Sequence, residues 1–235
     1  MANEDQLSLF PLSSGDAPKP QPEVDRRLIP TSAQIPIPPG TYQSIDELAD
    51  HCRQCHRCGL GETRTHAVVG RGNRQASIVI VGEAPGQNED EQGLPFVGRS
   101  GDLLEKILAS VKLSTKKDVY ICNTVNCRPP GNRTPTSAEV AACKPYLLEQ
   151  IRLIDPQIVL MTGATAVKAL TGDKRGMSKI RGTWLQWEGR LCMPIFHPAY
   201  LLRNPSKEPG KPKWLMWQDM QLVRQRLDEL KLASD

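Results

Sequence analysis

The sequence predicts an α/β protein with three layers, αβα, around a central parallel sheet of four strands. Short apolar runs that end in glycine or a polar residue alternate with stretches in which apolar residues recur at helical spacing. Repeated β–α units of this length favour parallel strands covered by helices on both faces. Hydrophobic residues make up 39% of the 235 residues, which is enough for the core of one moderate domain.

Four apolar runs are the predicted strands. Each run is short and continuous, as expected of a strand that is buried on both faces. The runs are residues 77–81, 119–123, 158–161 and 191–196.

Helices are expected after the strands. Ser100 is the expected N-cap of a helix whose apolar residues up to Val111 share one face. Thr136 and Glu139 have the spacing of a capping box at the start of the next helix. A third helix opens at Gly163, and residues 214–232 form a closing amphipathic helix.

The first forty residues differ from the rest of the chain. Eight prolines lie between Pro11 and Gly40, with serine, glycine and alanine among them. Such a segment buries too little apolar surface to offset the entropy of ordering it. We therefore expect residues 1–40 to be a disordered Pro-rich tail and residues 41–235 to form the folded domain.

Composition narrows the function classes. The net charge of +4 permits nucleic-acid binding without requiring it. No run approaches the ~18 apolar residues of a membrane span, and the N-terminus lacks a basic region before an apolar stretch, as a secretory signal would have. We expect a cytoplasmic protein that does not bind membranes and, because no heptad repeats are present, a monomer.

Seven cysteines in such a chain favour a metal site over disulfides. Cys52, Cys55 and Cys58 follow one another at a spacing that lets three thiolates bind one metal centre. A fourth ligand must come from Cys127 or Cys143, and either zinc or a [4Fe–4S] cluster accepts four thiolates. The two remaining cysteines lie inside predicted strands and are expected in the core: Cys122 and Cys192.

Polar residues follow three of the predicted strands. The loop from Gly82 to Gly86 follows the first strand, Asn123 ends the second, and His197 follows the fourth. Ligands of open α/β sheets bind beyond the carboxyl ends of the strands, so the active site is expected at this edge. The loop contains neither the dinucleotide fingerprint nor the triphosphate-binding loop.

Several motifs in this order resemble the family 4 uracil-DNA glycosylases, the iron–sulfur branch of the uracil-DNA glycosylase superfamily. The resemblance covers about residues 45–230. The motifs begin at Cys55 (CxxCxL), Gly82 (GEAPG, with Glu89 and Asp90 after it), Gly93 (GLPFVGRSG), Asn123 (NxxxCRPPGNR), Cys143 and His197 (HPAYLLR).

The resemblance implies a uracil-DNA glycosylase-like fold and a [4Fe–4S] cluster. It assigns Cys55, Cys58, Cys127 and Cys143 as the cluster ligands, and it leaves Cys52 as an additional thiol. In such enzymes the cluster is structural and holds loops that face DNA.

The resemblance also implies how uracil-containing DNA is handled. The base leaves the stack before the bond is cut. Leu201, or its neighbour Leu202, is then the wedge that enters the duplex, and Arg203 contacts the phosphates.

Residues of the loop and strand ends are expected to recognise and release the base. Phe96 stacks on uracil, Asn123 pairs with its O4 and N3–H, and Glu89 blocks the methyl group of thymine. Gly82 and Gly86 belong to the substrate-binding loop. His197 stabilises the charge that develops on O2 of the leaving base.

The residues that position the attacking water differ from those of the better-known uracil glycosylases. Ala84 stands where the better-known uracil glycosylases have their water-activating aspartate. Glu83 and Asn132 are the residues that we expect to position the water.

Near the N-terminus, the segment from Gln6 to Phe10 (QLSLF) resembles the pentapeptide by which bacterial repair proteins bind the sliding clamp. Its leucines and phenylalanine would fill an apolar pocket, and the Pro-rich segment would give it reach.

Two other functions are compatible with parts of the sequence. One is a related glycosylase that traps uracil covalently through a histidine, but residues 172–182 contain no histidine. The other is a non-enzymatic iron–sulfur DNA-binding module, against which the presence of Phe96, Asn123 and His197 argues.

Overall fold

A computed structural model describes residues 32–233 of the chain. The clamp-like segment from Gln6 to Phe10 lies outside the described residues. Within them, six strands form one sheet in the order β1-β3-β2-β4-β6-β5. The strands are β1 (Gly70–Gly72), β2 (Ile78–Gly82), β3 (Val119–Asn123), β4 (Ile158–Thr162), β5 (Leu185–Trp187) and β6 (Arg190–Ile195).

The four central strands are parallel and are the four that the apolar runs predict. The prediction of a four-stranded, purely parallel sheet was incomplete, because β1 and β5 add an antiparallel strand at each edge. Each edge strand has only three residues, and β1 reads Gly-Arg-Gly. Segments this short have no detectable apolar alternation, so sequence periodicity cannot reveal them.

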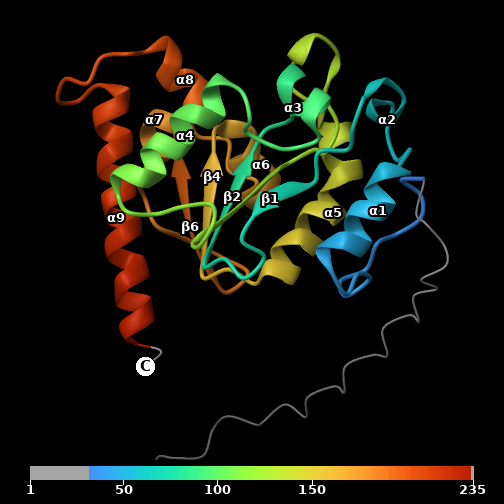
Figure 1. Ribbon diagram of the computed structural model, residues 1–235, viewed down its shortest axis with the longest axis horizontal. Coiled ribbons are helices and arrows are strands. Elements are labelled where there is room, and N and C mark those ends of the chain that lie inside the picture. The colour runs from blue at the N-terminus through green and yellow to red at the C-terminus, as the bar shows by residue number, and fades with distance from the viewer. Residues whose placement is uncertain (1–31, 234–235) are drawn as a thin grey trace, which may run out of the picture.

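Helices cover both faces of the sheet (Figure 1). They are α1 (Ile45–Arg53), α2 (Leu60–Thr63), α3 (Gln87–Gln92), α4 (Arg99–Ser110), α5 (Ser137–Ile154), α6 (Ala164–Thr171), α7 (Met177–Ile180), α8 (Pro198–Arg203) and α9 (Pro212–Leu232), with one turn of 3-10 helix at Pro130–Asn132. None of the helices in residues 32–233 is long and apolar enough to span a membrane.

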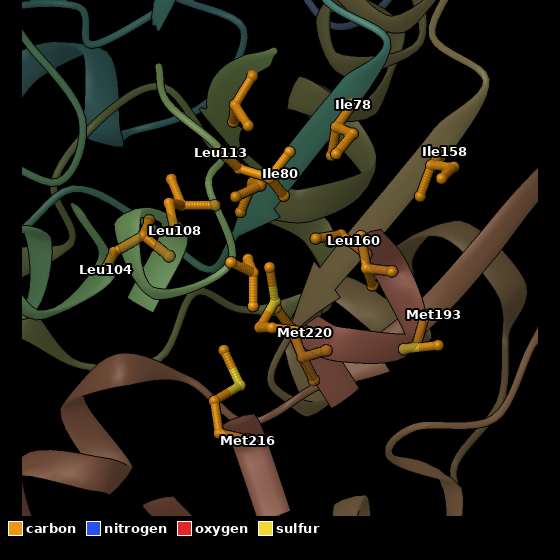
Figure 2. Packing of buried hydrophobic residues seen from close by; sticks show 14 of the residues in the cluster. Ile78, Ile80, Leu104, Leu108, Leu113, Ile158, Leu160, Met193, Met216 and Met220 are labelled. Atoms are coloured by element: carbon orange, nitrogen blue, oxygen red, sulfur yellow. The ribbon is translucent and has the colours of Figure 1, made fainter. Parts of the chain in front are cut away.

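One apolar cluster fills the space between the sheet and helices α4 and α9. Alternate residues of the strands, including Ile80 and Leu160, pack against Leu104 and Leu108 of α4 and Met220 of α9 (Figure 2). All five side chains are fully buried. This cluster fixes α4, which begins directly after the loop that carries Phe96.

The opposite face packs against α5 and α6. Val79 and Val81 of β2 and Met161 of β4 point to this side, where they meet Leu147 and Ile151 of α5. Both faces of the central strands are therefore apolar, which explains why each of these strands reads as a continuous apolar run.

Two helix starts test the capping predictions. The capping box at the start of α5 is confirmed: Thr136 Oγ1 accepts from the backbone N–H of Glu139 at 3.2 Å, and Glu139 Oε2 accepts from the N–H of Thr136 at 2.7 Å. The other prediction was wrong, because α4 begins at Arg99 with Gly98 as its N-cap, and Ser100 lies inside the helix.

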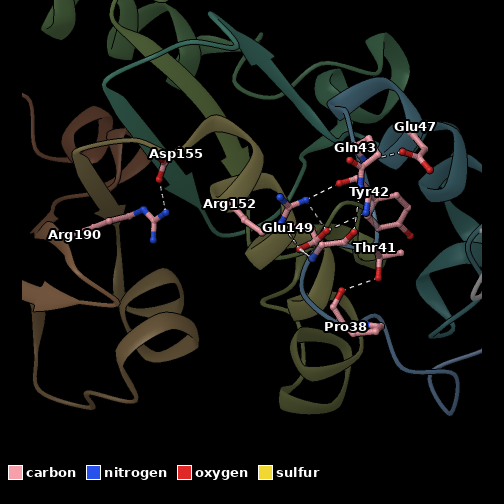
Figure 3. A network of polar contacts seen from close by, with 10 residues as sticks. Pro38, Thr41, Tyr42, Gln43, Glu47, Glu149, Arg152, Asp155 and Arg190 are labelled. Atoms are coloured by element: carbon pink, nitrogen blue, oxygen red, sulfur yellow. Dashed lines mark hydrogen bonds and ion pairs between the residues drawn. The ribbon is translucent and has the colours of Figure 1, made fainter. Parts of the chain in front are cut away.

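The segment before α1 is tied to α5 by a buried carboxylate (Figure 3). Glu149 accepts from the backbone N–H groups of Gly40 at 2.9 Å and Tyr42 at 3.1 Å, while Arg152 donates to the Tyr42 carbonyl at 2.5 Å. Arg57 donates to the carbonyl of Ile35 at 2.5 Å. Residues 32–40, which the sequence places in the tail, thus contact the domain.

Candidate active site and cysteine cavity

A cleft of about 650 Å³ opens at the carboxyl ends of β2, β3, β4 and β6. This is the edge at which the sequence predicts an active site. Eight of the predicted site residues line it: Glu83, Gly86, Glu89, Phe96, Asn123, Asn132, His197 and Arg203. The cleft also includes Arg133, Thr134 and Thr162, which sequence reasoning did not identify.

Asn123 brings an unpaired acceptor to the cleft. Asn123 is 2% exposed, and its Oδ1 has no hydrogen-bond partner among residues 32–233. Gly82, opposite Asn123 in the sheet, leaves room for this amide, since a Cβ at Gly82 would lie 2.2 Å from Asn123 Oδ1 and 2.7 Å from Phe96 Cε2. A buried acceptor without a partner is costly, so this amide is suited to pair with a ligand.

Phe96 occupies an uncommon backbone conformation, with a φ of 55°. This left-handed conformation is unfavourable for a bulky residue and tends to occur at functional sites. The ring is 6% exposed and stacks on His197, with ring centroids 5.6 Å apart and planes inclined by 30°. Gly101 is required beside it, because a Cβ there would lie 1.8 Å from the Phe96 carbonyl oxygen.

His197 is the N-cap of α8, and its Nδ1 accepts from the backbone N–H of Ala199 at 3.1 Å. In the neutral imidazole the proton is therefore on Nε2, which is free to donate. Burial lowers the pKa of His197, while Glu83 and Glu89 oppose this shift and Arg203 adds to it. The site thus favours a neutral histidine whose Nε2–H donates.

Glu89 holds the loops around the cleft. Its Oε1 accepts from the N–H groups of Val97 at 3.0 Å and Gly98 at 3.1 Å, and its Oε2 accepts from the N–H of Gly86 at 3.1 Å. A Cβ at Gly86 would lie 2.7 Å from Glu89 Oε2, so glycine permits this approach. The carboxylate therefore holds together the loop after β2 and the loop that leads into α4.

The two residues expected to position water differ in their surroundings. Glu83 is half-buried, and its carboxylate accepts from the Thr165 hydroxyl, while its backbone carbonyl accepts from the Thr124 hydroxyl. Asn132 is exposed, has a φ of 57°, and accepts from Arg128 Nε at 2.7 Å. Glu83 is the better fixed of the two.

Leu201 is not available as a wedge. It is 1% exposed and belongs to the core cluster between the sheet, α4 and α9. Its neighbour Leu202 lies on a different side of α8 and is half-buried, and Arg203 is exposed at the end of the same helix. Tyr200, which precedes Leu201 in the same helix, is 39% exposed.

A second and much smaller cavity, of about 20 Å³, is lined by cysteines. Five cysteines line it: Cys52, Cys55, Cys58, Cys127 and Cys143. They come from α1, the segment that leads into α2, the loop after β3, and α5. Cys122 and Cys192 are buried in strands, as the sequence predicts.

Nitrogen donors surround the thiols of this cavity. Arg64 donates to Cys127 Sγ at 3.1 Å, and the backbone N–H of Arg57 donates to Cys55 Sγ at 3.4 Å. Asn126 serves two sulfurs: its backbone N–H donates to Cys143 at 3.4 Å and its amide to Cys52 at 3.3 Å. Neither Arg64 nor Asn126 carries a sequence signal that would have identified it.

Burial raises the pKa of Cys127 to about 11, while Arg64 acts in the opposite direction. Within residues 32–233, no three His, Cys, Asp or Glu side chains are grouped so as to hold a single metal ion. The donor set is nevertheless all sulfur, with N–H groups directed at it, which is the environment of iron–sulfur clusters. The type of ligand atom and the N–H groups around it therefore match those of an iron–sulfur cluster.

Asp90 joins the two sites. It is 3% exposed, and its Oδ1 accepts from the N–H groups of Thr65 at 2.9 Å and His66 at 3.3 Å. These residues directly follow Arg64, which contacts the cysteine cavity, whereas Glu89 beside Asp90 holds the cleft loops. Adjacent carboxylates of α3 thus connect the two sites.

Comparison with known proteins identifies the family. A profile of the uracil DNA glycosylase superfamily matches residues 69–221. The type-4 uracil-DNA glycosylase of Thermotoga maritima is 47% identical over 166 residues, which cover 70% of this chain and 86% of that protein. The chain belongs to the type-4 uracil-DNA glycosylases. The resemblance inferred from the sequence motifs is thereby confirmed.

Two further relatives are a type-4 and a type-5 uracil-DNA glycosylase. The type-4 uracil-DNA glycosylase of Saccharolobus solfataricus is 40% identical over 170 residues, covering 69% of this chain and 79% of that protein. A type-5 uracil-DNA glycosylase of Pyrobaculum aerophilum is 28% identical over 205 residues, covering 74% of this chain and 90% of that protein.

Proposed function

We propose that this protein excises uracil from DNA by turning the base out of the helix and hydrolysing its N-glycosidic bond, the first step of base-excision repair. The observation that carries the proposal is the unpaired Oδ1 of Asn123, buried at a cleft that also contains Phe96 and His197. Membership in the uracil-DNA glycosylases supports the same activity.

Base recognition rests on the Asn123 amide. Its oxygen accepts from N3–H of uracil, and its nitrogen donates to O4. Cytosine presents an acceptor at N3 and a donor at C4, so it would leave both buried groups of the amide unpaired. Loss of hydrogen bonds in a buried site is a strong form of discrimination.

Departure of the base rests on His197. Cleavage leaves negative charge on O2 of uracil and an oxocarbenium-like sugar. A neutral imidazole with its proton on Nε2 donates to O2, while Nδ1 stays bonded to the Ala199 N–H. A preorganised donor of this kind stabilises the developing charge.

Water attacks the sugar, and Glu83 is the group that we propose to orient it. The hydroxyl of Thr165 holds the Glu83 carboxylate at the rim of the cleft. Asn132 lies on the facing loop and contributes as a second hydrogen-bonding group. We propose that Glu89, which is tied to the loop N–H groups, excludes the methyl group of thymine.

The DNA is held by the helix that follows His197. Arg203 is exposed at the cleft and suits a phosphate contact, which gives affinity without sequence preference. Leu202 replaces Leu201 as the proposed wedge because Leu201 is part of the core.

We also propose that the cysteine cavity binds a [4Fe–4S] cluster, with Cys55, Cys58, Cys127 and Cys143 as ligands. When bound, the cluster acts as a structural cross-link between the N-terminal helices, the loop after β3 and α5. Arg64 and Asn126 orient the ligands through the hydrogen bonds described above. The conformation of residues 124–134, between Asn123 and α5, would depend on this cross-link.

The decisive experiment is release of uracil from a labelled oligonucleotide by the cluster-loaded protein. Substrates with U:G, single-stranded U and T:G are compared. Release from the uracil substrates but not from T:G supports the proposal, whereas no release from any uracil substrate rejects the enzymatic function.

Binding to a bacterial sliding clamp through the segment from Gln6 to Phe10 is a separate proposal, which rests on the sequence pattern alone. A pull-down of the full chain with purified clamp tests it. Leu9→Ala together with Phe10→Ala is expected to abolish capture, and capture that is unchanged would reject the motif. Size-exclusion chromatography with light scattering of the same sample tests the expectation of a monomer.

A further inference from the structure

The edge strand β1 approaches its neighbour unusually closely. A Cβ at Gly70 would lie 2.1 Å from the hydroxyl oxygen of Tyr120, and a Cβ at Gly72 would lie 2.3 Å from the carbonyl oxygen of Val119. The φ of Gly72 is also positive, at 112°. Only glycine fits on either side of Arg71, and the Gly-Arg-Gly strand therefore fixes the point from which the arginine projects.

All three nitrogens of the Arg71 side chain are used. Nε donates to the carbonyl of Pro95 at 2.7 Å, one terminal nitrogen donates to the carbonyl of Phe96 at 3.0 Å, and the other pairs with Glu105 at 2.8 Å. The side chain is 19% exposed. These contacts converge on the residue whose backbone has the unfavourable positive φ.

Glu105 holds the guanidinium from the opposite side. It lies on α4 and also accepts from the Thr115 hydroxyl at 3.2 Å. The planar guanidinium is therefore fixed between α4 and the turn that carries Phe96. A forked donor can bond two successive carbonyls at once, whereas the single ammonium group of lysine cannot match that geometry.

We infer that Arg71 is a positioning residue that holds the ring of Phe96 for stacking on the extruded base. This inference rests on the proposed function, because it assigns the stacking surface of uracil to Phe96. Arg71 itself does not line the cleft. It acts on the Phe96 ring through the carbonyls of Pro95 and Phe96, to which its guanidinium donates. The backbone held in this way is that of Phe96, whose φ is unfavourable.

A double-mutant cycle tests the inference. Single-turnover rates of uracil release are measured for wild type, Arg71→Ala, Phe96→Leu and the double variant, with Arg74→Ala as the matched control. Arg74 is an exposed arginine three residues away whose partner is the exposed Asp46. Melting temperatures establish that each variant is folded, and Arg71→Lys serves if Arg71→Ala does not fold.

Arg71→Ala is expected to lower the maximal single-turnover rate about 10- to 100-fold with little change in the protein concentration that gives half of this rate, because the flipped base meets Phe96 only after the DNA is bound. Arg71→Lys should retain part of the rate. In the Phe96→Leu background, Arg71→Ala should have less than about a twofold further effect, since the two residues act as one unit. Arg74→Ala should match wild type.

Three results would overturn the inference. Equal rates for wild type and a folded Arg71 variant would show that the turn needs no such support. Multiplicative losses in the double variant would show that Arg71 acts independently of Phe96. Lack of uracil release by wild type would reject the proposed function, and the inference with it, whereas either of the first two results would reject only the part played by Arg71.

Discussion

The cleft at the sheet edge and the cysteine cavity are built in opposite ways. The cleft has a volume of about 650 Å³ and contains a buried acceptor, Asn123 Oδ1, without a partner. The cavity has about 20 Å³, and its sulfurs receive N–H donors from residues such as Arg64 and Asn126. A large site with an unpaired group suits a ligand that comes and goes, and a small site whose sulfurs are paired suits one that stays.

The two sites share structural elements. Asn123 ends β3, and Cys127 follows four residues later. Thr134 lines the cleft just before α5, whose Cys143 lines the cavity. Variants at residues that line only one of the two sites can separate the chemistry of the cleft from the stability that the cavity provides.

The largest effect on activity is expected for Gly82→Ala. The added methyl group would meet Asn123 Oδ1 at 2.2 Å and Phe96 at 2.7 Å, so the recognition amide or the ring must move. Single-turnover uracil release should fall by about 100-fold or more, because small misplacements of reacting groups are costly. Gly176→Ala, where a Cβ would meet nothing within 4 Å, is the control and should keep the wild-type rate.

A substitution in the cysteine cavity should lower the stability of the protein. Cys127→Ala removes a cluster ligand, so the visible absorption and iron content should be lost and the free energy of unfolding should fall by about 4 kcal/mol or more. Cys192→Ala is the control, because this buried thiol of β6 does not line the cavity. Full iron content and unchanged stability of Cys127→Ala would contradict the proposed ligand set.

The pH dependence should report on His197 of the cleft. Burial lowers its pKa below the ordinary 6.5, so release should be constant near neutral pH and decline only at more acidic pH. Protonation of Nδ1 would break the bond from the Ala199 N–H and displace the ring. In the unfolded chain the pKa of His197 is near 6.5, so as pH falls the unfolded chain binds the proton before the folded protein does. The free energy of unfolding should therefore also decrease as pH falls below 6.5.

The variant His197→Gln is the control for the pH profile of uracil release by the wild-type protein. It should lack the acidic decline that comes from the imidazole and should release uracil more slowly at every pH. An identical acidic decline in the variant would assign that decline to a different group.

The smallest effect is expected where the two regions meet, at the start of α5. Thr136→Ala removes the acceptor for the Glu139 N–H and should cost about 1 kcal/mol of unfolding free energy in denaturant titrations. Uracil release at 25 °C should stay within twofold of wild type, since Thr136 lines neither site. A large loss of activity would mean that the helix start is part of the catalytic geometry.

The sequence predicted most of the sheet and the cleft because both follow from patterns along single segments. Apolar runs marked the four central strands, and the ends of these strands carried Asn123 and His197. The edge strand β1 was missed because Gly-Arg-Gly has no apolar pattern, and its arginine is meaningful only through contacts with Pro95 and Phe96.

Other features depend on contacts between distant segments. Leu201 and Leu202 are adjacent in a helix of six residues, and periodicity over so few residues could not show that Leu201 enters the core. Arg64 reaches Cys127 across 63 positions of the chain. The choice among five thiols for four ligand positions stays a prediction, since all five line the cavity.

The central claim is that the Asn123 amide selects uracil at the edge of the sheet. The most direct test is the single-turnover rate of uracil release by Asn123→Ala beside wild type, with melting temperatures for both. The account predicts a loss of about 100-fold or more with no decrease in melting temperature, because the acceptor has no partner within the part of the chain that the structure describes. A folded Asn123→Ala variant that releases uracil at the wild-type rate would contradict it.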